Sequence, residues 1–122
     1  MAWILDDSRP IYLQIVDLIK TEIIAGVYRP GDKLPSVRDL AMEASVNPNT
    51  MQKALTELER SGLVYTQRTN GRFITEDIAK MTEIKEQLAR EQIQNFLKAM
   101  EQLGFTKEEI KKLLQTELRE EL

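Results

Sequence analysis

The stretch NPNTMQKALTELERSGL, residues Asn47–Leu63, decides the fold. Asparagine is favoured just before a helix and proline suits the first helical position, so a helix is predicted from Pro48 to a stop at Gly62. One side of this helix is apolar and should be buried; it consists of Met51, Ala54, Leu55 and Leu58. The other side is polar without a regular pattern of ion pairs; it carries Asn49, Gln52, Lys53, Thr56 and Arg60. That side is either an ordinary wetted surface or a recognition surface.

Two helices are predicted upstream of this stretch. From Ile11 to about Ala25, apolar residues recur at spacings of three and four, and Gly26 supplies the stop. A turn rich in proline and glycine follows, so that helix cannot continue. A short helix then begins after Ser36, whose hydroxyl can accept an amide hydrogen of the first turn, and ends near Glu43 or Ala44.

A β-hairpin is predicted downstream. Leu63–Gln67 and Arg72–Thr75 are short strand-like runs, and the Asn-Gly pair at Asn70 and Gly71 between them is the strongest short hairpin signal. Residues 1–75 are therefore predicted to form, in order, a helix, a short helix, a turn, a third helix and a hairpin. This order predicts a mainly α fold with a small β-hairpin, the winged helix-turn-helix.

The remainder, residues 76–122, is predicted to be helical. Residues 77–103 contain no glycine or proline, Gly104 breaks the helix, and Thr106 with Glu109 forms a capping box that opens a last helix. Apolar residues recur along both helices; they include Ile84, Ile93, Phe96, Leu103, Ile110, Leu114, Leu118 and Leu122. A segment of about 46 residues has too little chain to bury such a seam well. Dimerisation through residues 77–122 is favoured over an intramolecular helical hairpin.

Composition excludes several classes of function. The chain has 122 residues with no cysteine and no histidine, so thiol nucleophiles, imidazole bases and the usual zinc sites are absent. Its 20 acidic residues are dispersed, without a paired arrangement beside a glycine loop or apolar pocket. We therefore predict no enzyme, no catalytic residue, no cofactor and no metal. The sequence contains neither an apolar run of about 20 residues nor a secretory signal, and together with the absence of cysteine this fits a cytoplasmic protein.

The net charge of −3 is unevenly distributed. Residues 1–75 hold nine basic and nine acidic residues, whereas residues 76–122 hold eight basic and eleven acidic ones. From Arg60 to Thr75 there are three arginines and no acid. The acidity belongs to the tail, so a local basic surface remains available to a polyanion.

The polar side of the third helix is interpreted as a surface that reads DNA. In a helix-turn-helix the residues near the start of the second helix approach base edges, and the side chains of Asn49, Gln52 and Lys53 suit adenine and guanine. Arg72 at the hairpin could reach DNA, and Arg38 could meet a phosphate. The simpler alternatives are a solvated helix face, solvated hairpin arginines, and an ion pair between Arg38 and a nearby acid.

Three motifs resemble the GntR family of bacterial transcription regulators. They are RPIYLQI (Arg9–Ile15), the PGDKLPSVRDLA segment that ends at Ala41, and VNPNT-x-x-KAL-x-ELE-x-x-GL (Val46–Leu63), with NGRFI (Asn70–Ile74) similar to the family's wing. The resemblance covers about residues 8–75, and the short tail is similar to the YtrA-like branch. Many family members have arginine at the positions of Pro48 and Gln52, glycine at Ser45 and a wing glycine at Thr69. A non-glycine residue at position 45 is therefore expected to adopt a left-handed conformation.

The resemblance implies a homodimer that binds double-stranded DNA at a palindromic operator, usually as a repressor. The residues assigned to DNA binding, from the resemblance and from the pattern together, are Arg38, Asn47, Asn49, Thr50, Gln52, Lys53, Arg60, Asn70, Gly71 and Arg72. Two alternatives stay open. One is a winged-helix module that docks a protein, and the other is a regulator that senses a small-molecule effector between the tail helices.

Overall fold

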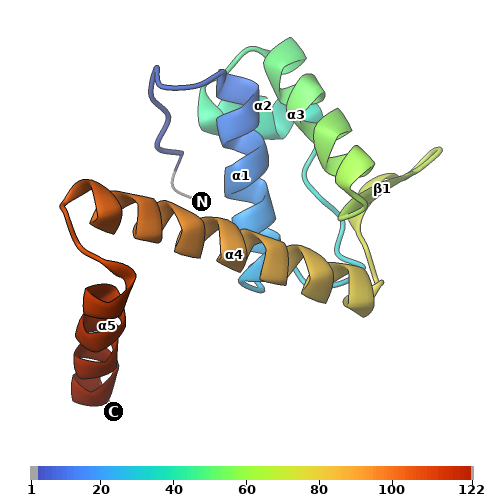
Figure 1. Cartoon of the computed structure of the whole chain (residues 1–122). Helices are drawn as coiled ribbons and strands as arrows, with labels where there is room; N and C mark the ends of the chain where they lie inside the picture. Colours follow the sequence, from blue (N-terminus) through green and yellow to red (C-terminus); the bar gives the residue numbers. More distant parts are fainter. Residues whose placement is uncertain (1–2, 122) are drawn as a thin grey trace. The chain divides into compact units, whose positions relative to one another are not determined.

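The structure is a computed structural model that describes residues 3–121, so the chain ends and the predicted seam residue Leu122 lie outside the described part. Its elements follow the predicted order to within one residue at each boundary and confirm a mainly α fold with a small hairpin (Figure 1). The elements are α1 (Ile11–Ile24), α2 (Val37–Ala44), α3 (Pro48–Ser61), β1 (Val64–Gln67), β2 (Gly71–Ile74), α4 (Ile78–Gln102) and α5 (Lys107–Glu121).

The core of the winged helix lies between α1, α2, α3 and the base of the hairpin. The predicted apolar side of α3 is fully buried, because Met51, Ala54, Leu55 and Leu58 are at most 1% exposed. The same core contains the buried residues Ile15, Ile19 and Ile23 of α1, Leu40 of α2, Leu63 just before β1 and Ile74 of β2. Burial of these large apolar side chains fixes the orientation of α3, so its polar side faces outward.

The predicted helix starts are confirmed by side-chain caps. The Ser36 hydroxyl accepts the Asp39 amide hydrogen at 3.1 Å, and the side-chain Oδ1 of Asn47 accepts the Asn49 amide hydrogen at 2.8 Å. Thr106 and Glu109 bond to each other's amides at the start of α5. Because these bonds satisfy amides that have no partner inside a helix, local sequence determines where the helices begin.

The turn between α2 and α3 holds Ser45 in a left-handed conformation, with φ 56° and ψ 45°, as the sequence predicts. Its amide nevertheless donates to the Met42 carbonyl oxygen at 3.2 Å, so the helix end is closed. A side chain in this conformation costs about 1–2 kcal/mol because the Cβ atom crowds the carbonyl oxygen. The helix-turn-helix therefore contains one locally unfavourable residue.

Replacing Ser45 with glycine should relieve this crowding. We expect Ser45→Gly to raise the free energy of unfolding by about 0.5–1 kcal/mol, since part of the gain is offset by the greater flexibility of glycine in the unfolded chain. Chemical denaturation measures the change. Ser45→Ala, which keeps the Cβ atom, is the matched control, and equal stability of the two variants would contradict the assignment of strain.

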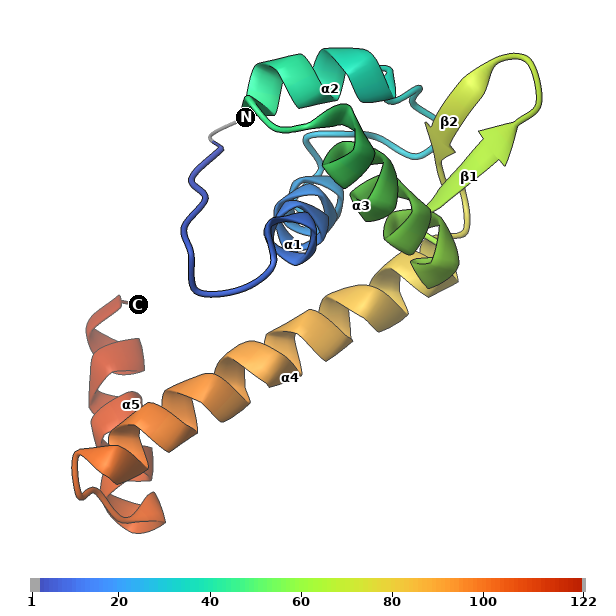
Figure 2. The ribbon, with the colours of Figure 1, turned by 90° about the horizontal axis from the view of Figure 1, so that it is seen from above.

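The hairpin is antiparallel and is bordered by a segment of the α1–α2 loop. Val64 pairs with Ile74, Thr66 with Arg72 and Gln67 with Gly71. On the other edge of β2, the Gly31 and Leu34 amides donate to the Ile74 and Arg72 carbonyl oxygens, each at 2.9 Å. The hairpin thus extends away from α3 as a wing whose β2 edge is occupied (Figure 2).

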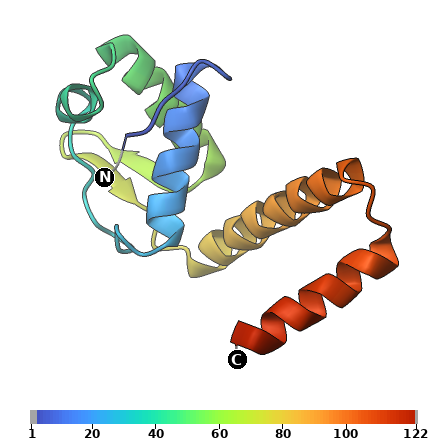
Figure 3. The same ribbon diagram turned by 90° about the vertical axis from the view of Figure 1, so that its left-hand side faces the viewer.

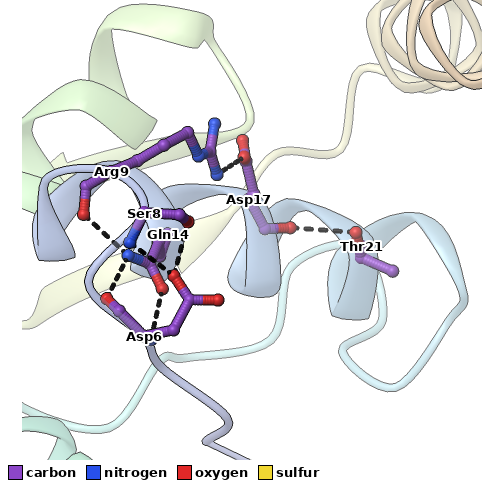
Figure 4. A network of polar contacts seen from close by, with 6 residues as sticks. All are labelled: Asp6, Ser8, Arg9, Gln14, Asp17 and Thr21. Carbon is purple, nitrogen blue, oxygen red and sulfur yellow. Dashed lines mark hydrogen bonds and ion pairs between the residues drawn. The ribbon is translucent and has the colours of Figure 1, made fainter. Parts of the chain in front are cut away.

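The N-terminal segment is fastened to α1 by one buried amide, that of Gln14 (Figure 4). Its Nε2 donates to the carbonyl oxygens of Asp6 and Arg9 at 2.8 and 2.7 Å, and its Oε1 accepts the Asp6 amide hydrogen at 3.0 Å. Arg9 also pairs with Asp17 at 2.6 Å. Because the buried Gln14 side chain satisfies three backbone groups, the segment before α1 has a defined path.

The described chain divides into two compact units, between Glu83 and Ile84. The sequence places the boundary at residues 75 and 76, before the start of α4. The difference arises because the first turns of α4 belong to the first unit, where Lys80 lies against Gly62.

In the second unit the chain turns back at Gly104, so that α5 follows α4 (Figure 3). Within residues 3–121, no helix combines the length and apolar character needed to cross a membrane.

Candidate nucleic-acid interface

The outward side of α3 presents most of the polar residues that the sequence singles out. Asn49, Gln52 and Lys53 are exposed in its first two turns, while Thr50 is half-buried. Asn47 lies just before the helix, where its side chain is used as the cap. The structure therefore brings Asn49, Gln52 and Lys53 onto one accessible surface, supported from behind by the buried side of the same helix.

Two of these side chains have partners in the isolated chain. The Gln52 amide donates to the Thr56 hydroxyl at 3.4 Å, a long and weak bond along the helix. The Lys53 ammonium lies 4.0 Å from the centre of the Tyr12 ring on α1, a cation–π contact. Tyr12 was not among the predicted site residues, because only the packing of α1 against α3 brings it to Lys53.

A hollow of about 850 Å³ lies between the start of α2 and the tip of the wing. Residues 33–39 form one wall and residues 69–72 the other, so three predicted wing residues, Asn70, Gly71 and Arg72, share it with Arg38. Lys33, Arg38 and Arg72 contribute positive charge there, against one acid, Asp39. A concave surface with this balance of charge attracts an anion.

Arg38 is an accessible cation of this hollow. Its side chain is exposed, and within the described residues it makes no hydrogen bond or ion pair. The alternative interpretation from the sequence, an ion pair with a nearby acid, is therefore not realised there. Arg38 projects from the first turn of α2 with all of its donors available.

The tip of the wing requires glycine at position 71. Gly71 has φ 100°, and a Cβ atom there would lie 3.2 Å from the Lys33 Cε atom. The Asn70 amide closes the turn by donating to the Gln67 carbonyl oxygen at 3.1 Å. Lys33, which the sequence analysis did not single out, is therefore held beside the tip and adds its charge to the hollow.

Two other predicted arginines are engaged by acids of α3. The Arg60 guanidinium pairs with Glu57 at 2.7 Å and remains 72% exposed, so this is an ordinary surface ion pair. The Arg72 Nε atom lies 2.5 Å from Glu59 Oε1, and the Arg72 side chain is only 19% exposed. The same Glu59 oxygen accepts a hydrogen bond from the Thr66 hydroxyl at 2.5 Å. Glu59 was not among the predicted site residues.

The Glu59 carboxyl is ionised at neutral pH. Burial alone would raise its pKa, but the hydrogen bonds from Thr66 and Arg72, with the charge of Arg72, outweigh burial and hold the pKa below its ordinary value of 4.5. Since the pKa is lowered on folding, the contact stabilises the folded state above pH 4.5 and is lost as the pH falls through the folded pKa.

Comparisons with known proteins agree with this geometry. The family model described as bacterial regulatory proteins, gntR family, matches residues 11–74. An uncharacterized HTH-type transcriptional regulator, YhcF of Bacillus subtilis, is 48% identical over 84% of this chain and 85% of its own. The HTH-type transcriptional repressor YtrA of the same organism is 49% identical over 66% of this chain and 67% of its own.

Solved structures give the same result. A GntR family transcriptional regulator from Listeria monocytogenes superimposes with a TM-score of 0.83 and 44% identity, covering 92% of this chain and 98% of its own. The AraR DNA-binding domain in complex with operator ORX1 has a TM-score of 0.55 and 26% identity, covering 59% of this chain and 93% of its own. The second match covers the winged helix, and the matched protein is bound to DNA in that structure.

Proposed function

The chain belongs to the GntR family of bacterial transcription regulators, which are DNA-binding proteins and not enzymes, and from that premise we propose that it represses transcription as a homodimer on a palindromic operator. The accessible polar surface of α3 is the observation that carries this proposal. The repressor role is supported by the name of the similar YtrA protein. The site of action is the cytoplasm, where the bacterial chromosome lies.

Base recognition is assigned to the start of α3. Asn49, Gln52 and Lys53 would enter the major groove, where amide and ammonium groups distinguish base edges. Asn47 and Thr50 lie at the same end of the helix and would contact the flanking backbone. This assignment is supported by the exposure of the three reading residues and by the rigid apolar packing behind them.

Phosphate contacts are assigned to residues that flank this surface. Arg38 would bind the backbone from α2 and Arg60 from the end of α3, while Asn70, Gly71 and Arg72 would approach it from the wing. The hollow between α2 and the wing supports this assignment, because its three cations gather where the duplex backbone would run. Such contacts hold a protein in register without reading sequence.

The two copies are proposed to join through residues 77–122. Six large apolar side chains of the second unit are 39–72% exposed within one chain; they are Ile93, Phe96, Leu103, Leu113, Leu114 and Leu118. The predicted seam residues Ile84 and Ile110, in contrast, are buried. An exposed apolar surface of this extent is typical of an interface, and a two-fold dimer would present two α3 helices about one turn of DNA apart.

Selection of bound duplexes from a random DNA pool tests the proposal. The expected result is a consensus with two-fold symmetry and a half-site spacing near one helical turn. An asymmetric consensus would contradict the dimer while keeping the DNA-binding function. The absence of any enriched sequence would instead favour a winged helix that docks a protein.

Arg38→Ala should weaken binding to the selected operator and to random duplex alike. The loss of one phosphate contact is expected to flatten the dependence of log affinity on log salt concentration by about 0.9. Titrations at several salt concentrations measure this slope. Arg29→Ala is the control, because Arg29 is exposed, carries the same charge and lies outside the hollow. An unchanged slope for Arg38→Ala would contradict its phosphate role.

A further inference from the structure

We infer that Glu59 is a positioning residue of the DNA interface, which acts through Arg72 and Thr66 to orient the wing on α3. This inference rests on the proposed DNA-binding function and deepens it. Glu59 is an acid on the helix that would bind a polyanion, so electrostatics alone would make it unfavourable there. The contacts of Glu59 with Arg72 and Thr66 explain why an acid occurs at this position.

One carboxylate oxygen of Glu59 links α3 to both strands of the hairpin. Glu59 Oε1 lies 2.5 Å from both the Thr66 hydroxyl oxygen and the Arg72 Nε atom. Thr66 belongs to β1 and Arg72 to β2, and the two residues are directly paired across the hairpin. One carboxylate oxygen therefore ties both strands of the wing to the last turns of α3.

The contact also determines how Arg72 presents its charge. Arginine has five N–H donors, and in the described part of the chain only the Nε donor is used. The four terminal donors remain available, and Arg72 lines the hollow that also contains Arg38 and Lys33. Glu59 thus fixes the inner edge of the guanidinium, which leaves its outer edge for a phosphate.

Burial distinguishes this contact from the other ion pair of α3. The side chains of Glu59 and Arg72 are 30% and 19% exposed, whereas Arg60 in its pair with Glu57 is 72% exposed. Exposed pairs contribute little because water screens them and their side chains stay mobile. The partly buried contact, with its second hydrogen bond from Thr66, restricts the wing more strongly.

The test is a double-mutant cycle on affinity for the operator selected above. We expect Glu59→Ala to lower affinity by about tenfold, a coupling within the usual range for contacting residues. In the Arg72→Ala background the same substitution should have a much smaller effect, because there is no guanidinium left to orient and only the Thr66 contact is lost. Glu59→Gln should restore most of the affinity, since its amide oxygen still accepts from Thr66 and Arg72.

Glu57→Ala is the matched control, because it deletes the same charge from α3 without touching the wing; since it also releases Arg60, it should leave affinity unchanged or raise it. Thermal unfolding of each variant establishes that the domain is folded. Unchanged or higher affinity of Glu59→Ala relative to the parent chain would overturn the inference, and so would equal losses in the two backgrounds. Failure of the parent chain to bind any duplex would overturn the proposed function itself, a result distinct from both.

Discussion

Leu118→Glu is expected to lower affinity for the two-fold operator by about 10²- to 10⁴-fold, because it would separate the two copies of the proposed dimer. When the copies are joined, the second half-site is bound at a high effective concentration; separate chains lose that gain. Leu118 is 62% exposed within one chain, so the substitution should leave the fold of that chain intact. A glutamate buried between two copies would be strongly unfavourable.

Sedimentation equilibrium and operator titration measure the two parts of this prediction. Thr116→Glu is the control, because it adds the same charge on the other side of α5, about 200° around the helix from Leu118. Affinity for a duplex with a single half-site should be similar for all three proteins. A Leu118→Glu protein that remains dimeric would contradict an interface on this side of α5.

Lys53→Ala is expected to reduce affinity for the operator by about 1–3 kcal/mol, roughly 5- to 150-fold, through loss of base contacts. The Lys53 ammonium lies over the Tyr12 ring, which limits its freedom before DNA is bound and so reduces the entropy cost of binding. The loss should be much smaller on random duplex, where bases are not read. The ratio of the two affinities is therefore the informative measurement.

Competition titrations with operator and random duplex give this ratio. Lys20→Ala removes the same charge from α1, outside the predicted surface, and should change both affinities little. If Lys53→Ala lowered both affinities equally and flattened the salt dependence, Lys53 would be a phosphate ligand rather than a base-reading residue.

Much of the fold could be predicted because the decisive signals are local. The caps at Ser36 and Asn47 lie within three residues of the amides that they bind, and Asn70 with Gly71 specifies a tight turn. The apolar side of α3 follows from helical periodicity alone. The left-handed conformation of Ser45 is expected for a different reason, because the family that the sequence resembles often has glycine at that position.

The contacts that organise the site depend on packing between distant segments. Glu59 meets Arg72 only because the hairpin lies against the end of α3, and no spacing along the sequence encodes that distance. Lys53 meets Tyr12 only because α1 packs against α3. The sequence therefore predicts which side chains are polar and face outward, but not which of them hold each other in place.

The α1–α2 loop that borders β2 has a consequence for how the protein behaves at high concentration. The amides of Gly31 and Leu34 donate hydrogen bonds to the outer edge of β2, so that edge is occupied. The other edge of the hairpin is formed by β1, which is only four residues long. An open strand edge can recruit strands from other molecules and start aggregation. Little unpaired backbone is therefore left in this hairpin on which a sheet could grow, so we expect the wing to resist strand pairing between molecules at high protein concentration.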